Sequence, residues 1–220
     1  GTAAVWICFG MGLCVIANAG TSFLVTFFKN LGITLTQGDV AKPNSIFECI
    51  LDIIGIAIVP AICEEFAMRC CALGLLKKYG KAFGVVSVSV VFGLLHGNVI
   101  QFVFAFLVGL VLAYITIKTE SIIPAMCIHA LNNGMSAVSD TVNYAAGKEV
   151  NVTVGFFAFW LLVGIIATIY LAIKRKLTIP KDDGNCVLTL GEKVSSFFFP
   201  GMILPFIVLI IMTAQTVKIG

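Results

Sequence analysis

Long apolar runs constrain the fold of this chain more than any other feature of its sequence. A helix needs about 20 apolar residues to cross the hydrocarbon core of a bilayer. Candidate runs of this kind cover residues 5–28, 46–76, 82–97, 99–117, 121–145, 152–173 and 197–217. They are continuous rather than alternating in polarity, and open sheet edges are not tolerated in lipid, so spanning strands are excluded. We therefore predict an all-α, polytopic bundle of about seven transmembrane helices, with residues 1–220 forming a single membrane domain.

The composition agrees with an integral membrane protein and excludes other classes. Hydrophobic residues make up 60% of the chain and charged residues 11%, whereas a soluble domain typically carries about 25% charged residues. The net charge of +3 comes without a basic run interleaved with aromatic residues. Nucleic acid is therefore not an expected partner, whereas the lipid bilayer is.

The segments between the runs orient the predicted bundle. Lysine and arginine gather in the loops after the second, fourth and sixth runs, and loops rich in these residues face the cytoplasm. We expect residues 29–45 to form an exterior loop or a surface helix, and residues 174–193 to form a connecting loop. The short loops favour a bacterial origin, so we expect a multi-pass protein of the bacterial plasma membrane.

A few ionisable side chains interrupt the apolar runs. They are Glu64, Glu65, Arg69, His96 and His129, and these two histidines are the only ones in the chain. Charge near the bilayer centre is costly, so such residues indicate a functional site. At about 1.5 Å of rise per residue, Glu64, His96 and Asn133 lie roughly 20, 22 and 20 Å from the polar ends of their runs, and His129 lies roughly 14 Å in. We therefore expect them to cluster within a narrow band of the membrane.

Helical spacing separates the roles of the two adjacent glutamates. Glu65 and Arg69 are four residues apart and can form an ion pair on one helix face. Glu64 points about 100° away from Glu65 around the same helix, so it is the expected working carboxylate. His129 and Asn133 are also four residues apart and present an imidazole and an amide side by side.

A carboxylate and two imidazoles at one low-dielectric place can activate water. Glu64 would act as the general base, and His96 or His129 would share its proton or polarise the water. Asn133 offers an N–H donor to the oxyanion that forms when water attacks an amide. The ring of Phe92, four residues before His96, is an expected packing neighbour of that histidine. These residues predict hydrolysis of an acyl bond, and of a peptide bond in particular.

Three short patterns stand in order along the chain: EEFAMR at 64–69, FGLLH at 92–96 and HALNN at 129–133. They resemble the EExxxR, FxxxH and HxxxN motifs of the CAAX-protease and bacteriocin-processing (CPBP) family of intramembrane proteases, which includes the type II CAAX prenyl endopeptidases. The resemblance covers roughly residues 46–145, which we interpret as the catalytic core.

The resemblance implies a catalytic group and a supporting group of residues. In the catalytic group, the water-activating pair is Glu64 and His96, and the residues that stabilise the transition state are His129 and Asn133. The supporting group is Glu65 and Arg69. Asn132 is a weaker candidate than Asn133, because Asn133 matches the motif and shares a face with His129. The implied activity is that of an intramembrane endopeptidase whose cavity opens toward the cytoplasm.

Cofactor and substrate stay open at this point. Members of the family have been described both as metalloproteases and as metal-independent glutamate enzymes, and the chain has no HExxH motif. Glu64, His96 and His129 could form a His₂Glu site for a divalent metal such as zinc. The expected partner is a peptide or protein substrate at the membrane, either prenylated or a bacteriocin precursor.

Two other functions also fit these residues. Buried Glu, His and Arg mark proton relays as well, so a proton-coupled transporter is an alternative. It is weakened because the sequence shows no inverted repeat and no matched pair of broken helices. A non-proteolytic member of the family, acting in bacteriocin immunity or as a scaffold, is the second alternative.

Overall fold

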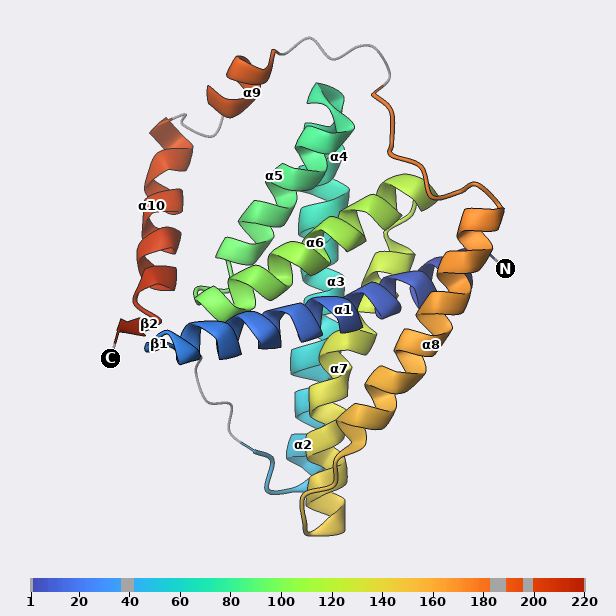
Figure 1. Ribbon diagram of the computed structural model, residues 1–220, viewed down its shortest axis with the longest axis vertical. Helices are drawn as coiled ribbons and strands as arrows, with labels where there is room; N and C mark the ends of the chain where they lie inside the picture. The colour runs from blue at the N-terminus through green and yellow to red at the C-terminus, as the bar shows by residue number, and fades with distance from the viewer. Residues whose placement is uncertain (1, 37–41, 183–188, 196–199, 220) are drawn as a thin grey trace. The chain divides into compact units, whose positions relative to one another are not determined.

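The structure, a computed structural model, describes residues 2–36, 42–182, 189–195 and 200–219. Within these residues the regular secondary structure is helical except for one pair of short strands (Figure 1). The elements are α1 (Thr2–Asn30), β1 (Ile33–Leu35), α2 (Ile46–Asp52), η1 (Ile53–Ile58), α3 (Val59–Glu65), η2 (Phe66–Ala72), α4 (Leu73–Leu76), η3 (Lys77–Tyr79), α5 (Lys81–Leu94), α6 (Val99–Thr119), α7 (Ile123–Ala146), α8 (Val152–Ile173), α9 (Leu190–Ser195), α10 (Pro200–Ala214) and β2 (Val217–Ile219). The predicted all-α fold class is confirmed.

The chain divides into two compact units, each assembled from three separate segments. The first unit comprises residues 1–16, 39–70 and 115–178. The second unit comprises residues 17–38, 71–114 and 179–220. The single membrane domain expected from the sequence stays a prediction.

Four helices in the described part of the chain are long and apolar enough to cross a membrane. They are Thr2–Asn30, Ile46–Tyr79, Val99–Thr119 and Val152–Ile173. The second of these is the continuous run from α2 to η3, 34 residues long, which we call the motif helix. α5 is apolar but has only 14 residues, fewer than the roughly 20 that span the hydrocarbon. The chain is thus an integral membrane protein, while the predicted count of seven spans is not confirmed.

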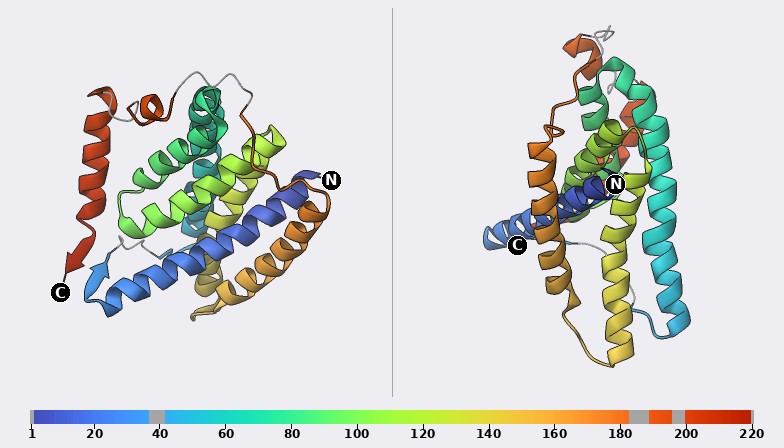
Figure 2. Two further views of the ribbon diagram at one scale, coloured as in Figure 1. Left: turned by 45° about the horizontal axis from the view of Figure 1, so that its top comes forward. Right: turned by 90° about the vertical axis from the view of Figure 1, so that its right-hand side faces the viewer.

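In the first unit, α7 packs along the motif helix, beside α2, η1 and α3 (Figure 2). Lys42 Nζ lies 3.4 Å from Glu149 Oε1 and so joins the start of the motif helix to the segment that follows α7. The two helices therefore run antiparallel. This pairing faces the residues of EEFAMR and HALNN toward one another.

In the same unit, α1 crosses α8 with no side chain between the two backbones. A Cβ added at Gly12 would lie 2.8 Å from Gly164 Cα, and one added at Gly164 would lie 2.6 Å from Gly12 Cα. Small residues allow this close approach, which is common between membrane helices because packing drives their association. Any larger side chain at either position would push α1 and α8 apart.

The second unit contains the two strands. β1 pairs antiparallel with β2, so that Ile33 lies opposite Ile219, and Thr36 Oγ1 donates to the Thr216 carbonyl at 3.0 Å. The expectation that residues 29–45 form only a loop or a surface helix is therefore wrong at β1. The strand forms because its partner comes from the far end of the chain, which local spacing does not reveal. The start of the span predicted at 197–217 and part of the loop predicted at 174–193 lie outside the described residues.

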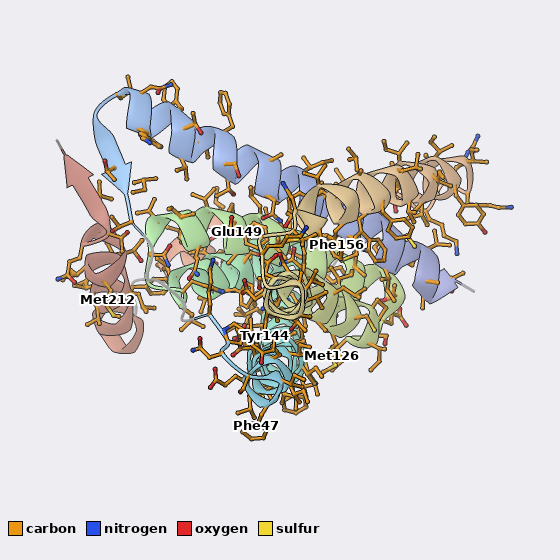
Figure 3. All side chains as sticks on the ribbon, turned by 90° about the horizontal axis from the view of Figure 1, so that it is seen from below. Phe47, Met126, Tyr144, Glu149, Phe156 and Met212 are labelled. Carbon is orange, nitrogen blue, oxygen red and sulfur yellow. The ribbon has the colours of Figure 1, made fainter. Side chains whose placement is uncertain are left out.

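Apolar side chains cover one face of the motif helix. Phe47 is 68% exposed and projects outward from α2 (Figure 3), and Ile62 and Phe66 are 53% and 54% exposed on the same helix. A large exposed apolar surface marks contact with a membrane or a partner. On a helix long enough to cross a bilayer, this face is suited to lipid.

Candidate active site

The other face of the motif helix is buried at every fourth residue. Ala57, Ala61, Glu65, Arg69 and Leu73 are all at most 3% exposed. In a regular α-helix, residues four apart drift by about 40° at each step, because a turn takes 3.6 residues. The π-helical segments η1 and η2 have wider turns, which offset this drift. The buried stripe therefore stays on one face and brings Glu65 and Arg69 to the interior.

Glu65 and Arg69 form the ion pair that their spacing predicts. Arg69 Nη1 donates to Glu65 Oε1 at 3.1 Å, and both side chains are fully buried. Two opposite charges at this distance compensate each other where water does not reach. Removing one partner of such a buried pair leaves an uncompensated charge, which typically costs about 3–5 kcal/mol. The pair thus keeps two charges compensated on the buried face of the motif helix.

Glu65 also holds the histidine of the HALNN motif. His129 Nδ1 lies 2.8 Å from Glu65 Oε1, and the imidazole side chain is 6% exposed. A carboxylate paired with arginine can only accept hydrogen bonds, so Nδ1 is the donor. This bond fixes the tautomer and the orientation of the ring. The Nε2 atom of neutral His129 is then left with a lone pair.

Glu64 faces that second ring nitrogen. Glu64 Oε2 lies 3.9 Å from His129 Nε2, beyond hydrogen-bond length, and its side chain is 43% exposed. The imidazole thus stands between two carboxylates, a buried one on Nδ1 and an accessible one near Nε2. Helical spacing predicted that Glu64 points away from Glu65. It did not predict that the two glutamates face the same imidazole ring from opposite sides.

Asn133 bonds to the backbone of the motif helix. In an α-helix the carbonyl of Ile56 would accept from the N–H of residue 60, but residue 60 is proline and has no N–H. Asn133 Nδ2 supplies the missing donor, at 3.2 Å from the Ile56 oxygen. Asn132 in turn donates to Asn133 Oδ1 at 3.3 Å. Because of Pro60, the Ile56 carbonyl lacks its usual helical donor, and Asn133 of α7 bonds to it.

His96 belongs to the second unit, where it follows the end of α5. Its Nδ1 lies 2.8 Å from the Phe92 carbonyl oxygen, and the Phe92 ring packs edge-on against it with centroids 5.1 Å apart. The expected contact between these rings is confirmed. Because a carbonyl only accepts, Nδ1 donates and Nε2 of neutral His96 keeps the lone pair. The convergence of His96 with Glu64 and His129 stays a prediction.

The donor atoms of the first unit do not complete a metal site. Zinc in proteins takes three or four protein ligands, and Glu64 with His129 Nε2 supplies two. Among the described residues there is no group of three or more His, Cys, Asp or Glu side chains that could hold a metal ion.

Sequence reasoning missed two contacts that shape the site. The bond from His129 to Glu65 gives Glu65 a second partner besides Arg69, and no spacing rule connects residues on different helices. The bond from Asn133 to Ile56 could have been anticipated, because Pro60 in a spanning helix always leaves one carbonyl without its usual donor.

Comparison with protein families agrees with the three motifs. The model of the Rce1-like family, described as type II CAAX prenyl endopeptidase Rce1-like, matches residues 46–135. That range contains EEFAMR, FGLLH and HALNN in full. No curated protein and no solved structure matches the chain. Residues 46–135 are thus similar to the Rce1-like family of type II CAAX prenyl endopeptidases.

Proposed function

We propose that this protein is an intramembrane endopeptidase that hydrolyses a peptide bond in a lipidated or membrane-associated substrate. The family match supports a protease of the CAAX type at the level of the family. The observation that carries the mechanism is the His129 ring, with Glu65 on Nδ1 at 2.8 Å and Glu64 near Nε2 at 3.9 Å. In this arrangement one carboxylate orients the imidazole ring and a second carboxylate, Glu64, faces its other nitrogen as the general base.

Water is activated between Glu64 and His129. One water molecule can bridge two polar atoms that lie about 3.9 Å apart. Glu64 takes one proton from this water while the oxygen attacks the carbonyl carbon of the peptide. Glu64 then returns the proton to the amide nitrogen as the C–N bond breaks. His129 Nε2 takes up the remaining proton that the new carboxylic acid releases.

Glu65 and Arg69 keep the imidazole ready for this step. If His129 gains a proton, its positive charge lies between the carboxylates of Glu65 and Glu64. A buried cation that is paired in this way does not carry the full cost of desolvation. The supporting pair therefore positions the ring and stabilises its charged form, without touching the substrate.

Asn133 and His96 complete the proposed machinery. An asparagine amide carries two N–H groups, and the bond to the Ile56 carbonyl uses one of them. The second N–H can donate to the oxyanion that forms on the peptide carbonyl. His96, whose Nδ1 is held by Phe92, offers Nε2 as the second water-activating base.

A direct test compares the protein with its Glu64→Ala and His96→Ala variants after purification in detergent. Cleavage of a panel of fluorogenic lipidated peptides is measured, with Glu149→Gln as the control, because Glu149 is an exposed carboxylate away from the motifs. We expect the control to cleave normally and both variants to lose at least about 100-fold in rate, the usual contribution of a general base. Unchanged cleavage in the variants would mean that the site is misassigned.

If no peptide of the panel is cleaved, the alternatives are tested on the same samples. Proton-coupled flux in proteoliposomes that depends on Glu64 would identify a transporter. Binding of a bacteriocin precursor without cleavage would identify an immunity or scaffold protein. Adding a chelator to an active sample decides whether the activity requires a divalent metal.

A further inference from the structure

A pocket lined by both basic and apolar residues lies in the first unit, in a place that the proposed catalysis does not use. It has a volume of about 530 Å³ and is lined by residues from the start of α1, the end of α6, the start of α7 and the segment after α8. The N-terminal end of α1 lies beside the C-terminal end of α8 in Figures 1 and 2. Its size is within the range of about 300–1,000 Å³ that ligand pockets occupy.

The lining of this pocket is positively charged. Lys118, Arg175 and Lys176 contribute to it, together with the hydroxyl groups of Thr119 and Ser121 and the buried ring of Trp6. Glu120, the acidic residue between the two hydroxyl residues, is exposed and does not belong to the lining. The pocket is therefore suited to an anion that accepts several hydrogen bonds.

The pocket lies where membrane helices end. α1 begins at Thr2, α6 ends at Thr119 and α8 ends at Ile173, and all three are long and apolar enough to cross a membrane. Helix ends that meet in this way lie at the level of the lipid head groups. Tryptophan is enriched at that level because its ring is apolar and its N–H is polar. Trp6 in the wall of the pocket agrees with this depth.

The backbone holds Arg175 in the pocket at a conformational cost. α8 ends in a Schellman motif, in which Arg175 N–H donates to the Ala172 carbonyl and Lys176 N–H donates to the Leu171 carbonyl, both at 2.9 Å. The residue in the left-handed position of this motif is usually glycine, but here it is Arg175, with φ at 52°. A position that favours glycine thus carries an arginine that lines the pocket.

Glu120 shows the same exception on the other side of the pocket. Its φ is 53°, and within the described residues Glu120 and Arg175 are the two non-glycine residues with positive φ. Residues held in rare backbone conformations gather at ligand sites, where the surrounding structure enforces them. Glu120 lies between two lining residues, and Arg175 is itself one, so both exceptions border this pocket.

We propose that the pocket binds the phosphate of an anionic phospholipid head group. Arginine recognises phosphate through two parallel N–H bonds, lysine adds point charge, and hydroxyl groups bind the remaining oxygens. Lys118 is already oriented, because its Nζ donates to Thr178 Oγ1 at 2.8 Å. The apolar side chains of Ile7 and Ile123 in the same lining suit the glycerol and the first carbons of the acyl chains.

Native mass spectrometry of the purified full chain tests this proposal. The protein is exchanged into nanodiscs of phosphatidylcholine that contain a small fraction of phosphatidylglycerol, and the lipids that stay bound after release are counted. We expect one phosphatidylglycerol to be retained, and retention to fall about fivefold for Lys118→Gln and for Arg175→Gly, since one cation near a membrane surface contributes about that factor. Lys174→Gln is the matched control, because Lys174 precedes Arg175 but does not line the pocket.

Arg175→Gly also separates binding from folding. Glycine fits the left-handed position better than arginine, so this variant should unfold at a higher temperature than the wild type while it retains less phosphatidylglycerol. Equal loss of lipid in Lys174→Gln would show a diffuse surface charge and overturn the proposal. So would equal retention of phosphatidylcholine, or displacement of the lipid by millimolar inorganic phosphate, which would identify a site for the free anion.

Discussion

Glu65 is the residue on which the candidate site depends most. One of its oxygens accepts from both Arg69 and His129, at 3.1 and 2.8 Å, so a single carboxylate neutralises a guanidinium and orients an imidazole. Its neighbour Glu64 is 43% exposed, and its Oε2 lies 3.9 Å from His129 Nε2. Adjacent glutamates therefore divide between structure and chemistry.

This division predicts different consequences for the same substitution at the two positions. Glu64→Gln should leave the thermal stability almost unchanged and lower the rate of peptide cleavage by about 100-fold or more, because only the base is lost. Glu65→Gln should lower the free energy of unfolding by about 3–5 kcal/mol, because Arg69 would remain buried beside a neutral group. Thermal unfolding in detergent, read together with the cleavage assay, distinguishes the two.

A second variant protects this prediction against a general loss of folding. Glu65→Gln combined with Arg69→Met removes both charges, so no uncompensated charge stays buried at this place. The double variant should therefore be more stable than Glu65→Gln alone. If the double variant is less stable, the pair is not the source of the loss.

At the scale of an element, the motif helix is shaped by one proline. Pro60 has no N–H, so it cannot donate the hydrogen bond that the Ile56 carbonyl would accept in an α-helix. The π-helical segment η1 precedes Pro60. Asn133 on α7 occupies that carbonyl instead. A break in one helix thus becomes the place where a second helix docks.

Pro60 and Asn133 should therefore be coupled in a double-mutant cycle. Asn133→Ala should destabilise the wild type by about 1–3 kcal/mol, because it leaves a carbonyl without a donor. In a Pro60→Ala background the new N–H can bond to Ile56, so the same substitution should cost about 1 kcal/mol less. Thermal unfolding of the four proteins measures this difference. Strictly additive losses would show that the two residues act independently.

The short helix α9 carries its own hydrogen-bonded cap. The Thr189 backbone N–H donates to Glu192 Oε2 at 2.7 Å, and the Glu192 N–H donates to Thr189 Oγ1 at 3.3 Å. The bonds from the Thr189 backbone and hydroxyl hold the pKa of Glu192 below its ordinary value, because they favour the charged carboxylate. The stabilisation is thus fully present above the ordinary pKa of about 4.3, and it is lost as the pH falls from there through the lower pKa of the folded protein.

Hydrogen exchange of the amides of α9 tests this dependence. In the wild type, we expect the α9 amides to be less protected near pH 3 than at pH 6, after correction for the intrinsic exchange rate. Glu192→Gln should show low protection at both values. Protection in the wild type that does not change between the two would mean that the carboxylate does not cap the helix.

At the scale of the whole molecule, much of the architecture could be predicted from the sequence. The apolar runs located the long helices, and four-residue spacing located the Glu65–Arg69 pair. The strand pair could not be predicted, because β1 and β2 are three residues each and depend on a partner from the other end of the chain. The bond between Glu65 and His129 was also out of reach, since it requires the register of α7 against the motif helix.

The first unit also predicts how the protein is oriented in the membrane. Lys118 and Arg175 lie with the start of α1, whereas Lys42 and Glu149 pair at the opposite end of α7. Basic loops face the cytoplasm, and Lys176 lies in the basic segment after α8. The cysteine of a Lys176→Cys variant should therefore be protected from an impermeant thiol reagent in intact bacterial cells. The cysteine of a Lys148→Cys variant should be labelled. Both variants are made in a protein without the native cysteines. The reverse pattern would invert the proposed topology.

The contact between Gly12 and Gly164 has a consequence at a distance. Thr2 lies ten residues before Gly12 and Arg175 lies eleven after Gly164, so both ends of the pocket are about 15 Å from the crossing point. A methyl group at the crossing point forces the axes of α1 and α8 apart, and because the helices are rigid, their ends at the pocket separate as well. Gly12→Ala changes no charge and lies outside the lining of the pocket. It should nevertheless lower the retention of phosphatidylglycerol in the mass-spectrometric measurement described above.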